Sequence, residues 1–524
     1  MYGIDVELPV MVYAVMARGP RYGGLAVSFN RDQVRAMPGV LDAFITERGV
    51  AVVADRYWRA RKAQEVLAVE WDFSEAVGLS NPDVFKHYRQ AAGEDPGEDE
   101  RVDGAPEAVL EKGSTLVEAE YEQPYLAHAT MEPMNATAWY RDGGMEVWAP
   151  TQALDLGRIA AARHTDLSPD DVTIHPTFLG GGFGRRLTQD YIEEAALVAY
   201  RVKVPVKLIW SREADTRHGF FRPAMLHRMA ASLEDGQLTG WDHQIVGPQI
   251  LDWYVRNAAP AQYPWAPKLL YGTLGRVGLM VEGIATPKDI SAIEGAIGYP
   301  YAVPNVRVRH THTDPGVPIT WWRSVGYSHN GFAVETFMDE LANQANEDPV
   351  SFRLKLLESG PRHRRVLERA AELAGWNQPV PEGRARGVAL FKSFGTYVAQ
   401  VVEAGVENGA IRVYKVTCSV DCGQVVNPRI VEDQIEGGIL FGLTAALYGE
   451  ITLENGEVQQ SNFHDYPLMR QYERPEVLVD IVASSESPTG VGEPGVPPVI
   501  PALGNALFAL NGKRQRSLPL RANA

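Results

Sequence analysis

The sequence has 524 residues, of which 45% are hydrophobic, and this length is enough for about three or four domains with large buried cores. Its 50 lysine and arginine residues are outnumbered by 66 aspartate and glutamate residues, which gives a formal net charge of −16. Such a charge repels polyanions at long range and argues against nucleic acids or anionic membranes as partners. No run of about 18 apolar residues occurs, and no basic region followed by an apolar one opens the sequence, so we expect neither a transmembrane helix nor a signal peptide.

The chain has two cysteines, Cys418 and Cys422. They are too few for an iron–sulfur cluster with four thiolate ligands or for a cysteine-rich zinc site, so any such cluster must lie in another chain. Both cysteines fall on the apolar face of an expected strand. We therefore predict buried structural thiols.

In chain order, residues 1–90 mix short strands with a helix near residues 58–65 and predict a small α+β domain. The acidic stretch 93–100 is interpreted as a solvated linker or loop. From residue 116 onward, alternating strands lead to a helix at 154–163, a strand that begins near Val172, a second helix near 192–199 and a strand at 202–210. This order indicates a strand–helix–strand unit.

Residues 216–320 are rich in aromatic residues, proline and glycine, and their elements cannot be assigned from periodicity. Helices are expected again from Val334 to Ala345, from Asp348 with an N-cap and a first-turn proline, and at 362–374. Strands at 397–403 and 411–420, a helix at 431–448, a proline-dense stretch at 490–501 and a helix at 502–511 complete the chain.

Four glycines surround Phe183 in the stretch from Leu179 to Arg186, between the strand and the helix that we expect there. Glycines let backbone amides approach a ligand, and a helix N-terminus favours an anion. The pair Arg185 and Arg186 is a candidate for a local positive pocket. A tight turn with no ligand explains this stretch equally well, because its spacing fits neither the Rossmann nor the Walker pattern.

Glu493 lies between glycines and prolines, in a segment that predicts a rigid turn. Such a carboxylate is suited to act as a general base in a cleft, although a cap of the following helix is the simpler interpretation. Arg323 comes after two tryptophans in a loop before a helix. Its guanidinium is suited to bind a phosphate bidentately or to stack on an aromatic ring, and a surface arginine that packs on Trp322 explains the position equally well.

Two glutamines are further candidates: Gln152 at a strand end, and Gln434 in a helix beside a pair of glycines. For both, a solvent-facing side chain is the default expectation. His310 and His312 share one strand face, but two ligands without a third make a weak metal site, and a hydrogen-bonded surface pair is favoured. No nucleophile motif for a covalent hydrolase is present.

Taken together, these segments resemble the molybdenum-cofactor-binding large subunits of the xanthine dehydrogenase and aldehyde oxidase family. The resemblance rests on the order of five segments: 148–152, 180–184, Arg323 before 332–335, 434–438 and 490–494. Three further segments, 128–136, 323–330 and 421–428, are most similar to its isoquinoline 1-oxidoreductase beta subunit branch, which includes membrane-bound aldehyde dehydrogenases.

The resemblance implies an α+β fold, with a small hammerhead-like α/β domain followed by two elongated mixed α/β molybdopterin-binding domains. These domains correspond to residues 1–90, 105–360 and 380–524. The last is expected to be incomplete, because the family's Gly-Gln-Gly segment is absent and the chain starts at a point that is internal in the family. An export signal belongs to that upstream region in this branch, so a periplasmic location is plausible by family and the compartment stays open.

The resemblance also implies the chemistry. Molybdenum would be held by a pterin cofactor, typically the cytosine dinucleotide form in this branch, and by no protein side chain. Glu493 would be the general base of a hydroxylation in which the product oxygen comes from water. The cofactor-binding residues implied by the family pattern are Gln152, Gly181, Gly182, Phe183, Gly184, Arg323, Gln434 and Gly492.

Electrons would leave through a separate small iron–sulfur subunit, and another chain would supply the missing N-terminal region. The substrate would be an aldehyde or an N-heterocycle. The leading hypothesis is thus a molybdenum hydroxylase large subunit. The alternative is a non-catalytic or split-gene fragment that keeps the fold and acts as a binding scaffold.

Overall fold

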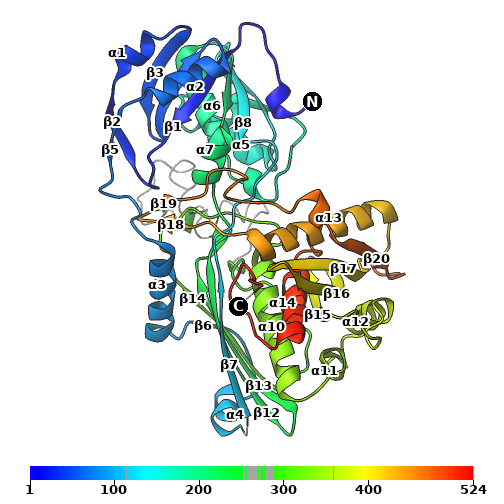
Figure 1. Ribbon diagram of the computed structural model, residues 1–524. Helices are drawn as coiled ribbons and strands as arrows, with labels where there is room; N and C mark the ends of the chain where they lie inside the picture. Colours follow the sequence, from blue (N-terminus) through cyan, green and yellow to red (C-terminus); the bar gives the residue numbers. More distant parts are fainter. Residues whose placement is uncertain are drawn as a thin grey trace.

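The computed structural model has a mixed α/β fold (Figure 1), in agreement with the fold class predicted from the sequence. The residues that it describes are 1–113, 115–251, 255, 270, 273–274, 277, 288–357 and 359–522. Within these residues, no helix combines the length and the apolar character that crossing a membrane requires.

A seven-stranded sheet contains strands from both the first segment and the region before residue 210. Its order is β10-β9-β8-β11-β1-β4-β3. The strands are β1 (Val12–Ala17), β3 (Val40–Thr46), β4 (Gly49–Ala54), β8 (Asn135–Arg141), β9 (Gly144–Ala149), β10 (Val172–Pro176) and β11 (Val206–Ile209). β1 pairs with β11 in parallel. Three strands of residues 1–90 therefore lie in a sheet with later strands, and the hammerhead likeness stays a prediction.

The helices on this sheet are α2 (Tyr57–Glu65), α5 (Leu154–Ala162) and α6 (Asp190–Val202). The apolar face of α6 predicted from Ile192, Ala195, Ala196 and Ala199 is fully buried in the core. Shorter elements nearby are β2 (Leu25–Phe29), α1 (Arg31–Arg35), β5 (Val69–Asp72) and α7 (Arg212–Arg217).

A long five-stranded sheet lies below the first sheet in Figure 1. Its order is β6-β14-β13-β12-β7, with β6 (Glu98–Asp103), β7 (Thr115–Gln123), β12 (Met225–Glu234), β13 (Gln237–Gly247) and β14 (Asn305–His312). The helices α3 (Asn81–Glu94) and α4 (Pro106–Lys112) lie beside it. Three of these strands fall in the region 216–320 that periodicity left unassigned.

The interpretation of residues 93–100 as a linker was wrong. These residues end α3 and begin β6, which pairs antiparallel with β14. The reason is that β6 is an edge strand whose side chains are exposed or half-buried. An edge strand of this kind needs no apolar alternation, so its sequence has the composition of a loop.

The third layer is a four-stranded sheet covered by long helices. Its order is β15-β16-β17-β20, with β15 (Arg384–Ser393), β16 (Thr396–Glu407), β17 (Ala410–Asp421) and β20 (Glu476–Ile481). Around it lie α10 (Val325–Gln344), α11 (Pro349–Lys355), α12 (Pro361–Leu373), α13 (Pro428–Tyr448) and α14 (Val499–Asn511). A short ribbon of β18 (Leu453–Glu454) and β19 (Glu457–Val458) comes after α13.

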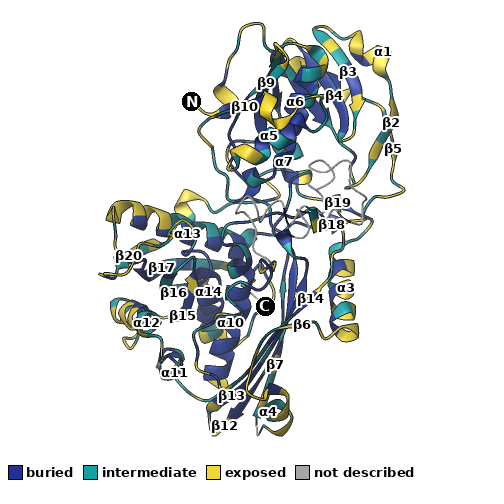
Figure 2. Ribbon diagram, turned by 180° about the vertical axis from the view of Figure 1, so that it is seen from behind, coloured by how far each residue is buried: buried dark blue, intermediate teal, exposed yellow. Residues whose placement is uncertain are grey.

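Helix α10 is buried along most of its length and joins the core of the five-stranded sheet to that of the four-stranded one (Figure 2). The stripe that predicted it is buried from Val334 to Leu341. The predicted cap of α11 is also confirmed, since the Ser351 amide donates to Asp348 Oδ1 at 2.8 Å. Both cysteines are buried as predicted, and burial raises the pKa of the Cys418 thiol to about 12.

Candidate functional site

The glycine loop, residues 179–186, leaves β10 and carries the first group of candidate residues. Three residues in it have positive φ: Gly181 (97°), Phe183 (54°) and Gly184 (102°). The Gly180 amide donates to Glu132 Oε2 at 2.8 Å. Within the described residues, the amides of Gly181, Gly182 and Phe183 donate no hydrogen bond. The loop therefore offers three adjacent backbone donors to a ligand.

Close contacts explain why glycine is needed at two positions of this loop. A Cβ atom on Gly182 would lie 2.5 Å from Gln152 Oε1, and one on Gly184 would lie 1.9 Å from the Trp321 carbonyl oxygen. The Gly184 amide also donates to Gln152 Oε1 at 3.2 Å. The side chain of Gln152 thus contacts the loop, and it is exposed, as the default expectation of a solvent-facing side chain has it.

The helix expected after the glycine loop is α6, which begins at Asp190 after a 3-10 turn (Arg185–Leu187). The expectation of a local positive pocket at Arg185 and Arg186 was wrong. Arg185 is buried and pairs with both carboxylate oxygens of Asp190, while Arg186 donates to Gly181 O at 2.7 Å and pairs with Glu132.

The second group of candidates comes from the loop before α10, from α13 and from the proline-dense segment. Arg323 Nε donates to the Gly492 carbonyl oxygen at 2.8 Å, and Nη2 donates to the Gln434 carbonyl oxygen at 3.3 Å. The side-chain oxygen of Gln434 would lie 3.7 Å from a Cβ atom on Gly492. Arg323 therefore binds main-chain carbonyl oxygens and connects its own loop with α13 and the proline-dense segment. This role was not predicted from the sequence. Burial lowers the pKa of Arg323, and the charge of Glu493 opposes this shift.

Phe441 of α13 joins the two groups. Its ring centroid is 4.6 Å from that of Phe183 and 4.7 Å from that of Trp322, and the Arg323 guanidinium lies 5.7 Å from the same ring. The structure thus brings the glycine loop and Gln152 together with Arg323, Gln434 and Gly492. Phe441 was not among the predicted residues, because one phenylalanine in an apolar helix carries no sign of its partner.

Glu493 is half-buried at the start of α10. Its Oε1 accepts a hydrogen bond from the Ser324 amide at 2.8 Å, and its main-chain carbonyl accepts one from Ser324 Oγ at the same distance. The expected cap is present, but it belongs to α10 and not to the helix that comes after Glu493 in sequence. A second acid, Glu294, accepts from the Gly326 amide at 3.1 Å and was also missed, because the region 216–320 gave no pattern.

The two histidines of β14 have different surroundings. His310 is buried, and its Nε2 lies 3.0 Å from the Gly247 carbonyl oxygen, whereas His312 is exposed. The expectation of a surface pair was therefore wrong for His310, which the sheet covers. Among the residues that the structure describes, no group of three or more histidine, cysteine or acidic side chains is arranged to hold a metal ion.

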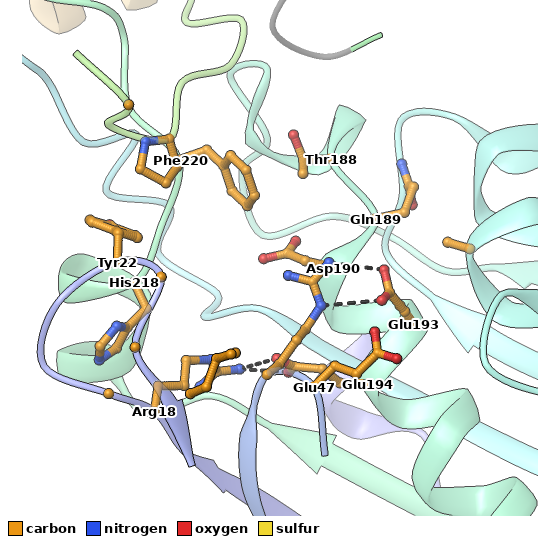
Figure 3. A pocket seen from close by; sticks show the side chains of 18 of the residues that line it. Arg18, Tyr22, Glu47, Thr188, Gln189, Asp190, Glu193, Glu194, His218 and Phe220 are labelled. Atoms are coloured by element: carbon orange, nitrogen blue, oxygen red, sulfur yellow. Dashed lines mark hydrogen bonds and ion pairs between the residues drawn. The ribbon is translucent and has the colours of Figure 1, made fainter. Parts of the chain in front are cut away.

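A cavity of about 590 Å³ is lined in part by the segment that connects the glycine loop to α6 (Figure 3). Its wall contains two ion-paired clusters: Arg18 with Glu194 at 2.5 Å, and Arg48 with Glu193 at 3.0 Å. Thr188, Gln189 and Asp190 also line it, but none of the candidate residues named above does. Because these arginines are already paired, the cavity does not offer them to an anionic ligand.

The chain matches known families along most of its length. Two family models, each described as a molybdopterin cofactor-binding domain, match residues 93–249 and 327–475. The isoquinoline 1-oxidoreductase subunit beta of Brevundimonas diminuta is 30% identical over 99% of this chain and 66% of its own length. The membrane-bound aldehyde dehydrogenase of Gluconacetobacter polyoxogenes, whose name includes pyrroloquinoline quinone, is 29% identical over 99% of this chain and 69% of its length. The chain therefore spans about two thirds of each relative.

Among solved structures, quinoline 2-oxidoreductase from Pseudomonas putida 86 has a similar fold. The TM-score is 0.79, the match covers 100% of this chain and 95% of that chain, and 15% of the aligned residues are identical. At this identity the likeness concerns the fold alone.

Proposed function

The chain belongs to the molybdenum-cofactor-binding large subunits of the xanthine dehydrogenase and aldehyde oxidase family, and on this premise we propose that it oxidises an aldehyde or an N-heterocycle with water as the oxygen source. The observation that carries the proposal is the meeting of the glycine loop with Arg323, Gln434 and Gly492 around Phe441. We further propose that the cofactor is molybdenum-molybdopterin in its cytosine dinucleotide form.

The donor set of the site fits such a group. The free amides of Gly181, Gly182 and Phe183 are suited to oxygen atoms of the cofactor, and the lack of a Cβ atom at Gly182 keeps room for Gln152 beside them. When bound, the cofactor supplies the two-electron redox chemistry of the hydroxylation. Holding it requires no side-chain ligand to the metal, because the pterin would carry the metal.

The chain's own residues then have separate tasks. Arg323 fixes the Gly492 carbonyl, which places Glu493 one residue later, and the Ser324 amide orients the Glu493 carboxylate. In this position Glu493 would accept the proton of the attacking oxygen nucleophile as a general base. Gln152, beside the glycine loop, and Gln434, beside Gly492, would orient the cofactor.

A separate small iron–sulfur subunit is proposed as the electron acceptor. Support comes from the two buried cysteines, which are too few for a cluster in this chain. The two relatives described above carry names of a subunit and of a membrane-bound enzyme, which is compatible with an assembly of several chains.

The test is elemental analysis of the purified chain, expressed alone and together with the products of neighbouring genes. We expect about one molybdenum per chain in the complex and oxidation of an aldehyde or N-heterocycle with ¹⁸O transfer from labelled water. Protein that lacks molybdenum in both preparations would favour the scaffold function. Incorporation of ¹⁸O from dioxygen would contradict the proposed reaction.

A further inference from the structure

Two carboxylates bind the first turn of α10, two residues apart. Glu493 Oε1 accepts from the Ser324 amide at 2.8 Å, and Glu294 Oε2 accepts from the Gly326 amide at 3.1 Å. The two acids come from distant parts of the chain, the proline-dense segment and the turn before β14. A helix N-terminus stabilises negative charge, but two carboxylates beside one turn also repel each other.

The backbone of this turn is strained at the residues between the two contacts. Ser324 has φ of 79° and Val325 has φ of 44°, and a β-branched residue rarely adopts the left-handed region. Gly326 then packs closely, since a Cβ atom there would lie 2.4 Å from the Ser291 carbonyl oxygen and 3.0 Å from Glu294 Cβ. The turn directly follows Arg323, which binds the Gly492 carbonyl oxygen. Its geometry is therefore relevant to the whole candidate site.

The surroundings of Glu294 favour its neutral form. Burial raises its pKa to about 8, the hydrogen bond from Gly326 opposes this shift, and the charges of Asp289 and Glu493 add to it. Tyr327, the next residue of α10, is a further titratable group that interacts with both acids, and burial raises its pKa. Within the described residues, Glu294 Oε1 makes no hydrogen bond, so this oxygen has room to carry the proton.

We propose that Glu294 is a positioning residue that holds a proton beside the active site, so that Glu493 is the single charged carboxylate on the first turn of α10. The inference rests on the proposed function for the role of Glu493, but the pairing of the two acids is a property of the chain itself. One carboxyl group is then neutral and the other is charged, as in enzymes in which two neighbouring carboxyl groups have different roles.

Alkaline pH should disturb this arrangement. When Glu294 loses its proton, two anions lie beside the strained turn, and their repulsion displaces one of them from its amide. The turn that orients Arg323 and Glu493 then relaxes, and turnover falls. We therefore expect turnover to fall as Glu294 loses its proton, near pH 8.

The first test uses the full chain without cofactor and measures the carboxylic acid C=O stretch by infrared spectroscopy from pH 6 to pH 10. In spectra of each protein taken relative to its own spectrum at pH 10, we expect a wild-type band that disappears with a midpoint of about pH 8 and that Glu294→Gln lacks. In Glu493→Gln the midpoint should move to lower pH, because the repelling charge is gone. Absence of the band at pH 6, or an unchanged midpoint in Glu493→Gln, would overturn the proposal.

The Glu493→Gln comparison needs no change at Glu294, so it remains decisive if Glu294→Gln does not fold.

The second test uses the loaded complex. Glu294→Gln, which copies the neutral acid, should keep turnover at pH 7 within about threefold of wild type and retain it above pH 8, where wild type declines. An alkaline limb identical to that of wild type would refute the role of Glu294. A wild-type complex without molybdenum or turnover would instead contradict the proposed function and leave the infrared result to decide on the acid pair.

Discussion

The rings of Phe183 and Phe441 lie 4.6 Å apart and are inclined by 32°, although one belongs to the glycine loop and the other to α13. This contact joins the regions matched by the two family models. Aromatic pairs at this distance contribute about 0.5–1.5 kcal/mol beyond the area that they bury. Because Phe441 also touches Trp322 and lies beside Arg323, its loss should loosen both sides of the site together.

Phe441→Ala should therefore bind less cofactor and unfold more easily, by roughly 1–3 kcal/mol because the ring is only partly buried. Molybdenum content and urea unfolding measure the two effects. Tyr472→Ala is a suitable control, because Tyr472 is 79% exposed. Unchanged molybdenum content in Phe441→Ala would mean that the two sides of the site are held together by other contacts.

Gly182→Ala tests whether the loop must be free of side chains. The new methyl group would lie 2.5 Å from Gln152 Oε1, so either Gln152 or the loop must move. We expect a loss of cofactor of at least tenfold with a change in the free energy of unfolding below about 1 kcal/mol, because Gln152 is exposed and can swing outward. Gly93→Ala in α3 has open space around its Cβ position and is the matched control. Full cofactor occupancy in Gly182→Ala would exclude a role for this contact.

Helices and strands differ in how well the sequence predicted them. The helix expected at 362–374 lies within one residue of the observed α12 at both ends, because an apolar stripe with a period of 3.6 residues survives in any tertiary setting. The strands β12, β13 and β6 were not predicted. Most residues of β12 and β13 are buried on both faces of the sheet, whereas the residues of β6 are exposed or half-buried. Neither kind of strand shows the apolar–polar alternation of a strand with one buried face.

The site shows the same division. Residues in glycine- or proline-rich motifs, such as Gly182 and Glu493, stand out because an unusual backbone needs unusual residues. Their partners do not: Ser324 and Glu294 are ordinary in composition and become important only through contacts across more than 30 residues. Arg185 and Arg186 illustrate the opposite error. Their charges suggested a ligand, but Asp190 and Glu132 already bind them.

Acid should destabilise the protein through buried histidines such as His128. Burial lowers its pKa to about 3, while its contact with the Trp321 carbonyl, 2.7 Å away, partly opposes the shift. Below a pH of about 6.5 the His128 side chain binds a proton in the unfolded chain but stays neutral in the folded chain. The stability that is present at neutral pH is therefore lost as the pH falls from about 6.5 toward 3. For one such histidine, each unit of pH in this range lowers the free energy of unfolding by about 1.4 kcal/mol.

His128→Gln keeps an amide donor for the Trp321 carbonyl but cannot titrate. Between pH 7 and pH 5, its loss of unfolding free energy should be smaller than that of wild type by up to about 2 kcal/mol. The exposed His464 provides the control, since His464→Gln should show the wild-type dependence on pH. If His128→Gln loses as much unfolding free energy as wild type between pH 7 and pH 5, His128 must bind a proton in the folded state as readily as in the unfolded state.

Glu493→Gln provides the most direct test of the proposed chemistry. The amide has the same size and its oxygen can still accept from the Ser324 amide, so the turn and the cofactor should remain in place. It cannot accept a proton, and loss of a general base lowers turnover by roughly 10²- to 10⁴-fold. Steady-state kinetics with the cofactor-loaded complex, alongside molybdenum content and the absorption spectrum, separates the two effects. The exposed Glu382 serves as a control, because Glu382→Gln changes the net charge equally and lies outside the site. Retained turnover in Glu493→Gln would assign the base to another residue, whereas loss of molybdenum would show that the carboxylate helps to bind the cofactor.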